Sequence, residues 1–295
     1  MDIRVLQYFL TVAREESITK AAEALRMTQP PLSRQLKDLE EELGKQLLIR
    51  GSKKVTLTED GMLLRKRAEE MVDLMEKTKA ELTSSNENIN GDIYIGCGET
   101  EAVSFLAQTA QTLQSKHPSI HYHIYSGDAE RVMERLDKGL IDFGLLVGSA
   151  DVAEYNYMRL PMKDTWGVLM RKDSPLAEKQ EICAEDLWDK PLILSHQTSI
   201  NSEMFSWLKA DRVKLNIVAT YDLVYNASLF VEKGFGYVIA LDKLINTTGE
   251  SSLCFKPLYP ALDAGLCIIW KKYQVFSRAS NEFLRQLKCE MEINR

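Results

Sequence analysis

The stretch that decides the fold is Ser17–Arg50, with the sequence SITKAAEALRMTQPPLSRQLKDLEEELGKQLLIR. Its first part predicts a short helix, because a serine that can cap the helix precedes apolar residues that share one face. A second helix is expected after Thr28, with Pro30 and Pro31 in its first turn, where a missing N–H group costs little. Gly44 is placed to end that helix. The stretch therefore predicts a helix-turn-helix.

The second helix separates apolar from polar side chains. Its leucines repeat at intervals of four, three and four residues and predict a buried stripe: Leu32, Leu36, Leu39 and Leu43. Other faces carry hydrogen-bonding side chains that can reach base edges and phosphates: Gln29, Ser33, Arg34 and Lys37. We name these four residues the recognition face, with Gln29 and then Arg34 as the strongest candidates for base reading.

A short hairpin, or wing, is expected after this helix. Two apolar runs, Leu47–Ile49 and Val55–Leu57, flank the polar residues Gly51–Lys54. Arg50, Lys53 and Lys54 suit phosphate contact or insertion into a minor groove. Considered alone, the two lysines are typical of a solvated loop, but beside the helix pair we interpret them as DNA contacts.

Two further helices are predicted around this region. The first, which Asp2 can cap, would bury one side of the chain start: Val5, Leu6, Phe9, Leu10 and Ala13. The second begins after Thr58 and runs to about Ser84, with acids near the positive end of its dipole. Its apolar stripe is spaced as a heptad: Leu64, Ala68, Met71, Met75, Thr78 and Leu82. This seam predicts pairing with the same helix of a second subunit. The alternative is packing against its own domain.

A polar run from Ser84 to Gly91 predicts a linker, and beyond it short β-like runs alternate with helices. The expected strands are Ile93–Cys97, Ile120–Tyr125, Phe143–Val147, Trp166–Arg171, Leu192–Leu194, Ile217–Thr220, Tyr237–Leu241 and Leu266–Trp270. The expected helices are Glu101–Lys116, Ala129–Lys138, Leu223–Glu232 and Phe276–Glu290. This alternation predicts α/β architecture with largely parallel sheets.

Length and composition fit this division. The chain has 295 residues, 45% hydrophobic and 27% charged, which suits two or three folded domains. No apolar run approaches a membrane span, and the charged N-terminus argues against a secretory signal, so we expect a cytoplasmic protein. The net charge of −6 is uneven: residues 1–67 hold 13 Lys and Arg against 10 Asp and Glu, and the remainder 24 against 33. The mildly basic residues 1–67 would confine the electrostatic attraction of DNA to the N-terminal part of the protein.

Residues 1–67 resemble the N-terminal domain of LysR-type transcriptional regulators. The matching positions are Phe9, Ala13, Ser17, Thr19, Ala21–Ala22, Leu25, Gln29, Ser33, Leu39–Glu40, Leu43–Gly44, Leu47, Arg50, Leu57–Thr58 and Gly61. Leu48 departs from the family's usual phenylalanine and should alter wing packing rather than DNA contact. Weaker similarity to the family's effector domain, which is of the periplasmic-binding-protein type, continues at Gly91–Gly96, Leu140–Asp142 and Val231–Gly236. Leu241 stands where the family often has proline.

The resemblance implies a winged helix-turn-helix at 1–58, a linker and dimerisation helix at 59–90, and an effector-binding α/β domain at 91–295. Its lobe one would be residues 91–160 and 267–295, and its lobe two residues 161–266, hinged by two crossing segments. The implied partners are double-stranded operator DNA, a small-molecule effector of unknown identity, a second copy in a dimer or tetramer, and RNA polymerase. No cofactor and no membrane contact are implied.

Site residues are carried over by position. The DNA-binding set is Ser17, Thr19, Thr28, Gln29, Pro30, Ser33, Arg34, Lys37, Arg50, Lys53 and Lys54. The effector set, at the corner after the first strand and on the facing wall, is Glu99, Thr100, Asp128, Ser195, His196, Asn201, Tyr225 and Asn226. A helix N-terminus at this corner could donate N–H groups.

The effector's charge can be addressed from three acids at this corner. Glu99, Glu101 and Asp128 would oppose an anion and compete for the helix dipole. We therefore expect a neutral or cationic effector; the alternative is that the acids of the first turn point into solvent.

Two other pairs of residues give little indication of a metal or catalytic site. His121 and His123 share a strand face without further metal ligands at a characteristic spacing, and we expect them to point outward from buried Ile120, Tyr122 and Ile124. Ser195 and His196 are adjacent, which aims their side chains apart and excludes a nucleophile–base pair. We expect no enzymatic activity.

Two alternatives to an effector-controlled regulator remain open. The first is redox sensing through distant cysteines, of which the chain has five without close spacing: Cys97, Cys183, Cys254, Cys267 and Cys289. The second is a solute-binding α/β protein whose N-terminal helices are only structural.

Overall fold

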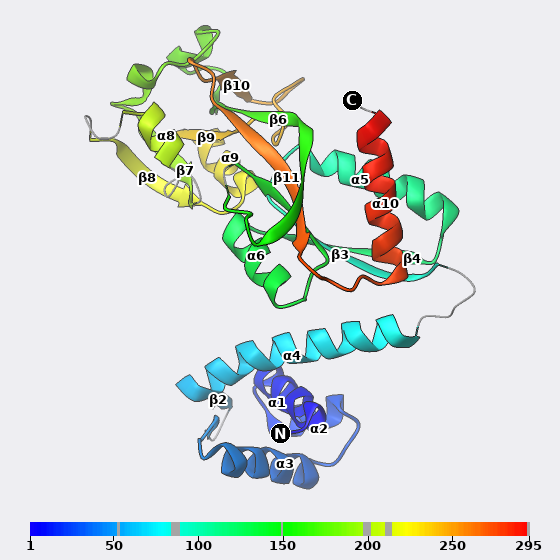
Figure 1. The fold of residues 1–295 in the computed structure, drawn as a ribbon. Helices are drawn as coiled ribbons and strands as arrows, with labels where there is room; N and C mark the ends of the chain where they lie inside the picture. Colours follow the sequence, from blue (N-terminus) through cyan, green and yellow to red (C-terminus); the bar gives the residue numbers. More distant parts are fainter. Residues whose placement is uncertain (52–53, 84–88, 149, 197–201, 210–213, 294–295) are drawn as a thin grey trace. The chain divides into compact units, whose positions relative to one another are not determined.

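The computed structural model describes residues 1–51, 54–83, 89–148, 150–196, 202–209 and 214–293. The chain divides into two compact units, Met1–Ser84 and Ser85–Arg295 (Figure 1). Lys53 and Asn201, which belong to the predicted sites, lie outside the described residues.

The first unit is a winged helix-turn-helix followed by a long helix. Its elements are α1 (Ile3–Glu15), α2 (Ile18–Ala24), α3 (Gln29–Leu43), β1 (Leu48–Arg50), β2 (Val55–Leu57) and α4 (Glu59–Thr83). The predicted caps on α1 and α2 are confirmed, since the side chains of Asp2 and Ser17 accept hydrogen bonds from the backbone N–H groups of Arg4 and Lys20. Thr28 occupies the cap position of α3, but its side chain makes no capping bond.

The core of this unit lies between α1, α2 and α3. Leu32, Leu36 and Leu39 are buried as predicted, whereas Leu43 is 39% exposed because α3 reaches the edge of the core in its last turn. On α1 the buried residues are Leu6, Phe9 and Val12; Val5, Leu10 and Ala13 are only partly buried. The predicted α1 stripe is therefore confirmed at Leu6 and Phe9, while Val5 and Leu10 pack against the core only partly buried and Val12 was missed.

The wing is held against the helices by Glu40 and Gly61. The Glu40 carboxylate accepts hydrogen bonds from the N–H groups of Leu47 (2.7 Å) and Leu48 (3.0 Å), so α3 fixes the start of β1. Leu48 is buried, as expected for a residue that affects wing packing. A Cβ atom at Gly61 would clash with the Leu47 carbonyl oxygen, which explains a glycine in the first turn of α4. That turn is capped as predicted, because Gly61 N donates to the Thr58 hydroxyl at 3.0 Å.

The second unit is a mixed α/β domain built on one continuous sheet. In lobe one the elements are β3 (Gly91–Cys97), α5 (Val103–Lys116), β4 (Ile120–Ser126), α6 (Ala129–Asp137), β5 (Phe143–Val147) and α10 (Arg278–Ile293). In lobe two they are η1 (Pro175–Glu178), η2 (Ala184–Leu187), β7 (Pro191–Ser195), α8 (Ser202–Trp207), β8 (Asn216–Tyr221), α9 (Val224–Glu232), β9 (Tyr237–Leu241) and β10 (Leu253–Pro257). Two long strands, β6 (Tyr155–Arg171) and β11 (Asp263–Lys271), run through both lobes.

The strand order is β4-β3-β5-β11-β6-β9-β7-β8, with β10 on β6. Within each lobe the pairs β3–β4, β3–β5, β7–β8 and β7–β9 are parallel, while β6 and β11 pair antiparallel with each other and with their other neighbours. The expectation of largely parallel sheets is thus correct for the lobe interiors and wrong for the crossing strands. These strands were predicted only over their apolar halves, and β10 was not predicted.

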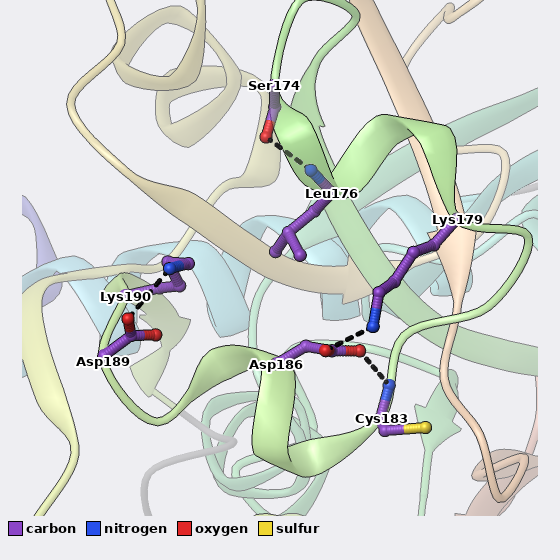
Figure 2. Close-up of polar contacts among 7 residues, drawn as sticks. All are labelled: Ser174, Leu176, Lys179, Cys183, Asp186, Asp189 and Lys190. Carbon is purple, nitrogen blue, oxygen red and sulfur yellow. Dashed lines mark hydrogen bonds and ion pairs between the residues drawn. The ribbon is translucent and has the colours of Figure 1, made fainter.

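Each lobe has its own core. In lobe one, α5 and α10 cover one sheet face around Phe143 and Phe283, and α6 covers the other (Figure 1). In lobe two, the 3₁₀ turns and α8 cover one face and α9 the other. Figure 2 shows the 3₁₀ turns, where Ser174 caps η1 through Leu176 N and Asp186 binds both Cys183 N and Lys179.

The edge strand β4 departs from the predicted alternation. Ile120 is buried and the two histidines are exposed as expected, but Ile124 is 56% exposed. The His123 ring stacks on the Tyr94 ring, and its Nε2 lies 3.0 Å from the Asp92 carboxylate. Both contacts are with side chains of the neighbouring strand β3.

Candidate functional site

The recognition face lies in the first half of α3, on its solvent side. Gln29, Arg34 and Lys37 are exposed and Ser33 is partly buried. Leu32, Leu36 and Leu39 lie on the opposite, apolar side of α3, which packs into the core and leaves the polar side exposed. In Figure 1, α3 and α4 lie on opposite sides of α1, so α4 leaves α3 uncovered within this unit.

The wing lies beside the recognition face. Arg50 Nη1 donates a hydrogen bond to the Ser33 hydroxyl at 3.2 Å, which joins the end of β1 to α3. Lys54 pairs with Glu16 at 3.3 Å, and Lys37 pairs with Glu41 at 3.2 Å. Exposed ion pairs of this kind contribute only about 0–1 kcal/mol, so DNA phosphates can replace these partners at low cost.

The remaining DNA-binding candidates lie around α2 and the start of α3. Thr19, Thr28 and Pro30 are exposed. The Ser17 hydroxyl caps α2, so its oxygen already accepts a hydrogen bond within the protein. The structure thus gathers α2, α3 and the wing into one small unit, as a winged helix-turn-helix requires.

The predicted seam on α4 divides into a covered and an open half. Ala68 is buried and Leu64 is partly buried, with Leu64 packing on the N-terminal core, so packing against its own domain is right for this half. Farther along, Met71 is 39% and Leu82 is 82% exposed. An apolar groove is lined there by Ile3, Met71, Leu74, Met75, Thr78, Lys79 and Leu82, and we name it the α4 groove.

A second candidate site is a cavity of about 270 Å³ between the lobes, which we name the interlobe cavity. Six of its lining residues stand at or just beyond the carboxyl ends of parallel strands: Gly98, Ser126, Val147, Ser195, Tyr221 and Leu241. Ligands of α/β proteins bind in crevices at these strand ends, because helix N-termini and loops meet there. The cavity therefore lies where the strand ends of the two lobes face each other.

Half of the predicted effector set lines this cavity. Glu99, Asp128, Ser195 and His196 do, on strand ends and the α6 cap. Tyr225, which is 64% exposed, and Asn226 lie outside it, because α9 starts at Val224 and turns their side chains to solvent. Glu101 is exposed and also lies outside the lining.

Thr100 is buried and hydrogen-bonded within the protein, and it does not line the cavity. It is only 5% exposed, and its hydroxyl oxygen accepts a hydrogen bond from Ala102 N at 3.0 Å. It also faces Asp164 on β6, whose pKa is raised by burial, although the Thr100 hydroxyl and the Lys243 ammonium oppose that shift. Asp164 Oδ2 has no hydrogen-bond partner among the described residues. Thr100 therefore lies behind the cavity wall.

Sequence reasoning missed several lining residues. They are Gly98, Ser126, Gly127, Arg131, Val147, Gly148, Trp166, Tyr221, Asp222, Leu223, Val224, Leu241 and Leu244. Arg131 could have been found, since it lies three residues after the predicted Asp128 on a helix. The lobe-two residues could not, because only the tertiary fold brings them opposite β3.

Polar groups of the interlobe cavity contact one another. Arg131 lies 3.6 Å from both the Asp128 and Asp222 carboxylates, the second of which belongs to lobe two. Glu99 Oε2 accepts a hydrogen bond from Val224 N at 2.7 Å, so a carboxylate of lobe one caps α9 of lobe two. Burial raises the pKa of Glu99, and this hydrogen bond acts in the opposite direction. Among the described residues, these polar contacts of Arg131 and Glu99 join the lobes across the cavity.

Metal and thiol chemistry have little support. No group of three His, Cys, Asp or Glu side chains that could hold a metal ion occurs in the described part of the chain. All five cysteines are free thiols. Burial raises the pKa of Cys97 to about 12 and also raises the pKa of Cys254 and Cys267, which lowers their thiolate fraction and reactivity.

A winged helix-turn-helix unit followed in the chain by a two-lobed unit with a cavity is the domain organisation of ligand-controlled DNA-binding proteins. The helices of the described residues include none long and apolar enough to cross a membrane. The family model "Bacterial regulatory helix-turn-helix protein, lysR family" matches residues 3–62, and "LysR substrate binding domain" matches residues 86–292. The chain belongs to the LysR family of bacterial transcriptional regulators.

Relatives and solved structures agree with this family. The transcriptional regulator BsdA of Bacillus subtilis is 39% identical over 143 residues, or 48% of this chain and 49% of BsdA, so the match spans about half of that relative. CysL of the same organism is 32% identical over 195 residues, 66% of this chain and 65% of CysL. The crystal structure of full-length CbnR with its target DNA has a TM-score of 0.76 at 16% identity, covering 98% of this chain and 99% of CbnR. This last likeness shows the fold.

Proposed function

We propose that this chain binds double-stranded operator DNA through the recognition face and the wing, and that a small-molecule effector in the interlobe cavity controls the outcome. The observation that carries the DNA-binding part is the exposed polar face of α3, joined to the wing by Arg50 and Ser33. Its relatives are transcription regulators, and we propose a regulatory rather than a catalytic role for the cavity.

A gel-shift assay at fixed salt, with the DNA upstream of its own gene, tests the recognition face. Gln29→Ala should weaken specific binding roughly ten- to hundred-fold, because a bidentate base contact is worth about 1–3 kcal/mol. Gln35→Ala is the matched control, since it removes the same exposed side chain from another face of α3. Equal binding by both variants would refute the assigned face.

The α4 groove supports a homodimer in this proposal. Its exposed apolar residues follow a heptad pattern, which favours an identical helix as the partner. Met71→Lys should weaken dimerisation in sedimentation velocity, because it puts a charge into the groove. Glu69→Lys, an exposed change on another face of α4, is the control. An unchanged assembly in Met71→Lys would contradict the assignment.

A redox-controlled regulator is the second candidate, but the structure offers it little. Three of the five thiols have a pKa raised by burial, which opposes the thiolate chemistry that such sensing needs.

A further inference from the structure

The charged side chains that line the interlobe cavity are mostly acidic. Among the described lining residues, three acids, Glu99, Asp128 and Asp222, accompany one guanidinium, that of Arg131. That guanidinium lies within 3.6 Å of both aspartates, so its charge is already shared between two carboxylates. An anionic ligand that approached Arg131 would also meet the negative charges of both aspartates. Among the described residues no cation pairs with the Glu99 carboxylate, which accepts a hydrogen bond from the backbone N–H group of Val224.

Four backbone N–H groups of the cavity wall are also engaged. Those of Gly98, Gly127 and Gly148 donate to carbonyl oxygens of the sheet at 3.0, 3.0 and 2.8 Å. Val224 N, in the first turn of α9, donates to Glu99 at 2.7 Å. Anion sites in proteins depend on such groups being available. Here a carboxylate of the protein occupies the position at which a bound anion would meet α9.

The rest of the lining suits an apolar body of small size. Trp166, Leu223 and Leu244 face the cavity, together with Val147 and Leu241. An indole face attracts cations as well as apolar groups. A cavity of about 270 Å³ lies just below the usual range for ligand sites, roughly 300–1,000 Å³, which fits a small metabolite.

We propose that the effector carries a protonated nitrogen, such as an ammonium or guanidinium group, which binds beside the Glu99 carboxylate with its apolar part against Trp166. This inference rests on the proposed function, since it names the effector class for the same cavity. Glu99 keeps its hydrogen bond to Val224 and turns its second oxygen to the cation. The bound cation thereby strengthens the contact that already joins the two lobes.

Isothermal titration calorimetry on the full chain tests the charge preference. The probes are matched pairs of one apolar body with opposite charges: benzylamine against benzoate, and phenethylamine against phenylacetate, each at up to millimolar concentration. Binding is located at the cavity by the indole N–H resonance of Trp166, assigned with Trp166→Phe. The amines should bind and shift this resonance, and the carboxylates should not.

Glu99→Gln separates charge from shape. Its amide oxygen can still accept from Val224 N, so the contact between the lobes is kept while the charge is lost. Amine affinity should fall roughly ten- to hundred-fold, the usual range for a hydrogen bond to a charged group. Glu101→Gln is the matched control, because Glu101 is a nearby exposed acid outside the cavity lining, and it should leave the affinity unchanged.

Three results would overturn the proposal: carboxylates that bind in place of amines, amines that bind equally well to Glu99→Gln, or no shift of the Trp166 resonance with any amine. Gel shifts on the same preparations distinguish this failure from failure of the proposed function. Specific DNA binding without amine binding refutes only the cationic effector, whereas absence of specific DNA binding refutes the proposed function.

Discussion

Along α3, Gln29, Arg34 and Lys37 extend into solvent, whereas at the interlobe cavity Glu99 and Arg131 bind groups of the facing lobe. The contacts of the recognition face are few and exposed, such as Lys37 with Glu41. Those of the cavity connect residues about ninety to 125 positions apart in the chain. The contact of Glu99 with Val224 N is partly buried, whereas the Arg131–Asp222 pair is about half exposed. The two regions therefore use polar side chains differently.

The difference follows from the ligands that each region would meet. DNA offers many phosphates and base edges in water, so side chains that reach it lose little when they leave weak surface partners. A small molecule offers few groups, so the cavity must discriminate through contacts whose replacement is costly. The exposed side chains of α3 are suited to contacting DNA, and the cavity is suited to discriminating between small molecules.

The largest expected effect comes from removing the support of the recognition face. Leu36 is 1% exposed beneath it, and Leu36→Ala should lower the free energy of unfolding of the N-terminal unit by about 2–5 kcal/mol, through lost burial and a residual cavity. Urea denaturation followed by circular dichroism measures this. Leu43→Ala, at a position that is 39% exposed, should cost much less. Equal losses would contradict the burial difference between the two leucines.

A smaller effect is expected at the wing. Glu40→Ala removes the acceptor for Leu47 N and Leu48 N. Because both N–H groups donate to the same carboxylate oxygen, Glu40 Oε1, we expect a combined loss of about 1.5–3 kcal/mol, the usual range for a hydrogen bond to a charged group. Hydrogen exchange at these two amides should quicken, and DNA affinity should fall with α3 intact. Glu41→Ala is the control, since Glu41 pairs only with exposed Lys37 among the described residues. Unchanged exchange in Glu40→Ala would show that Glu40 does not hold the wing.

The smallest effect concerns Asp164, behind the cavity. Because burial raises its pKa, the folded chain binds more protons than the unfolded chain at pH values between the ordinary 3.8 and the raised value. The contribution of this group to stability therefore falls as pH rises through that window. Asp164→Asn should remove this loss, so its stability relative to wild type should increase from acidic to neutral pH in paired urea titrations.

The opposite trend would contradict this sign. If Asp164→Asn became less stable than wild type on going to neutral pH, the ionised carboxylate would gain more from Thr100 and Lys243 than it loses through burial. Asp242→Asn is a suitable comparison, because Asp242 is a nearby acid on the same side of lobe two.

Much of the N-terminal unit could be predicted from sequence, because its signals are local. The caps at Asp2 and Ser17, the end of α3 at Gly44 and the start of α4 after Thr58 depend on residues within one helical turn. The prediction failed at Leu43, which follows the apolar period of α3 but lies beyond the core. The second half of the α4 seam also lies beyond the core, so its pairing with a second subunit stays a prediction.

The cavity was predictable only in part. Glu99 and Asp128 follow strands β3 and β4 directly, and the carboxyl ends of parallel strands meet at one edge of a sheet. Tyr225 and Asn226 were placed there on resemblance, but the helical phase of α9 points them to solvent. Trp166 and Asp222 gave no signal, since neither residue has a local pattern that marks it.

The sequence by itself determined the order of elements, the helix-turn-helix and the family, because caps, apolar periods and turn residues act over a few positions. Only the tertiary structure decided that Glu99 caps α9, that Arg131 lies between two aspartates, and that Thr100 lies behind the wall. These contacts join residues far apart in the chain, and the twice-crossing path of β6 and β11 brings them together.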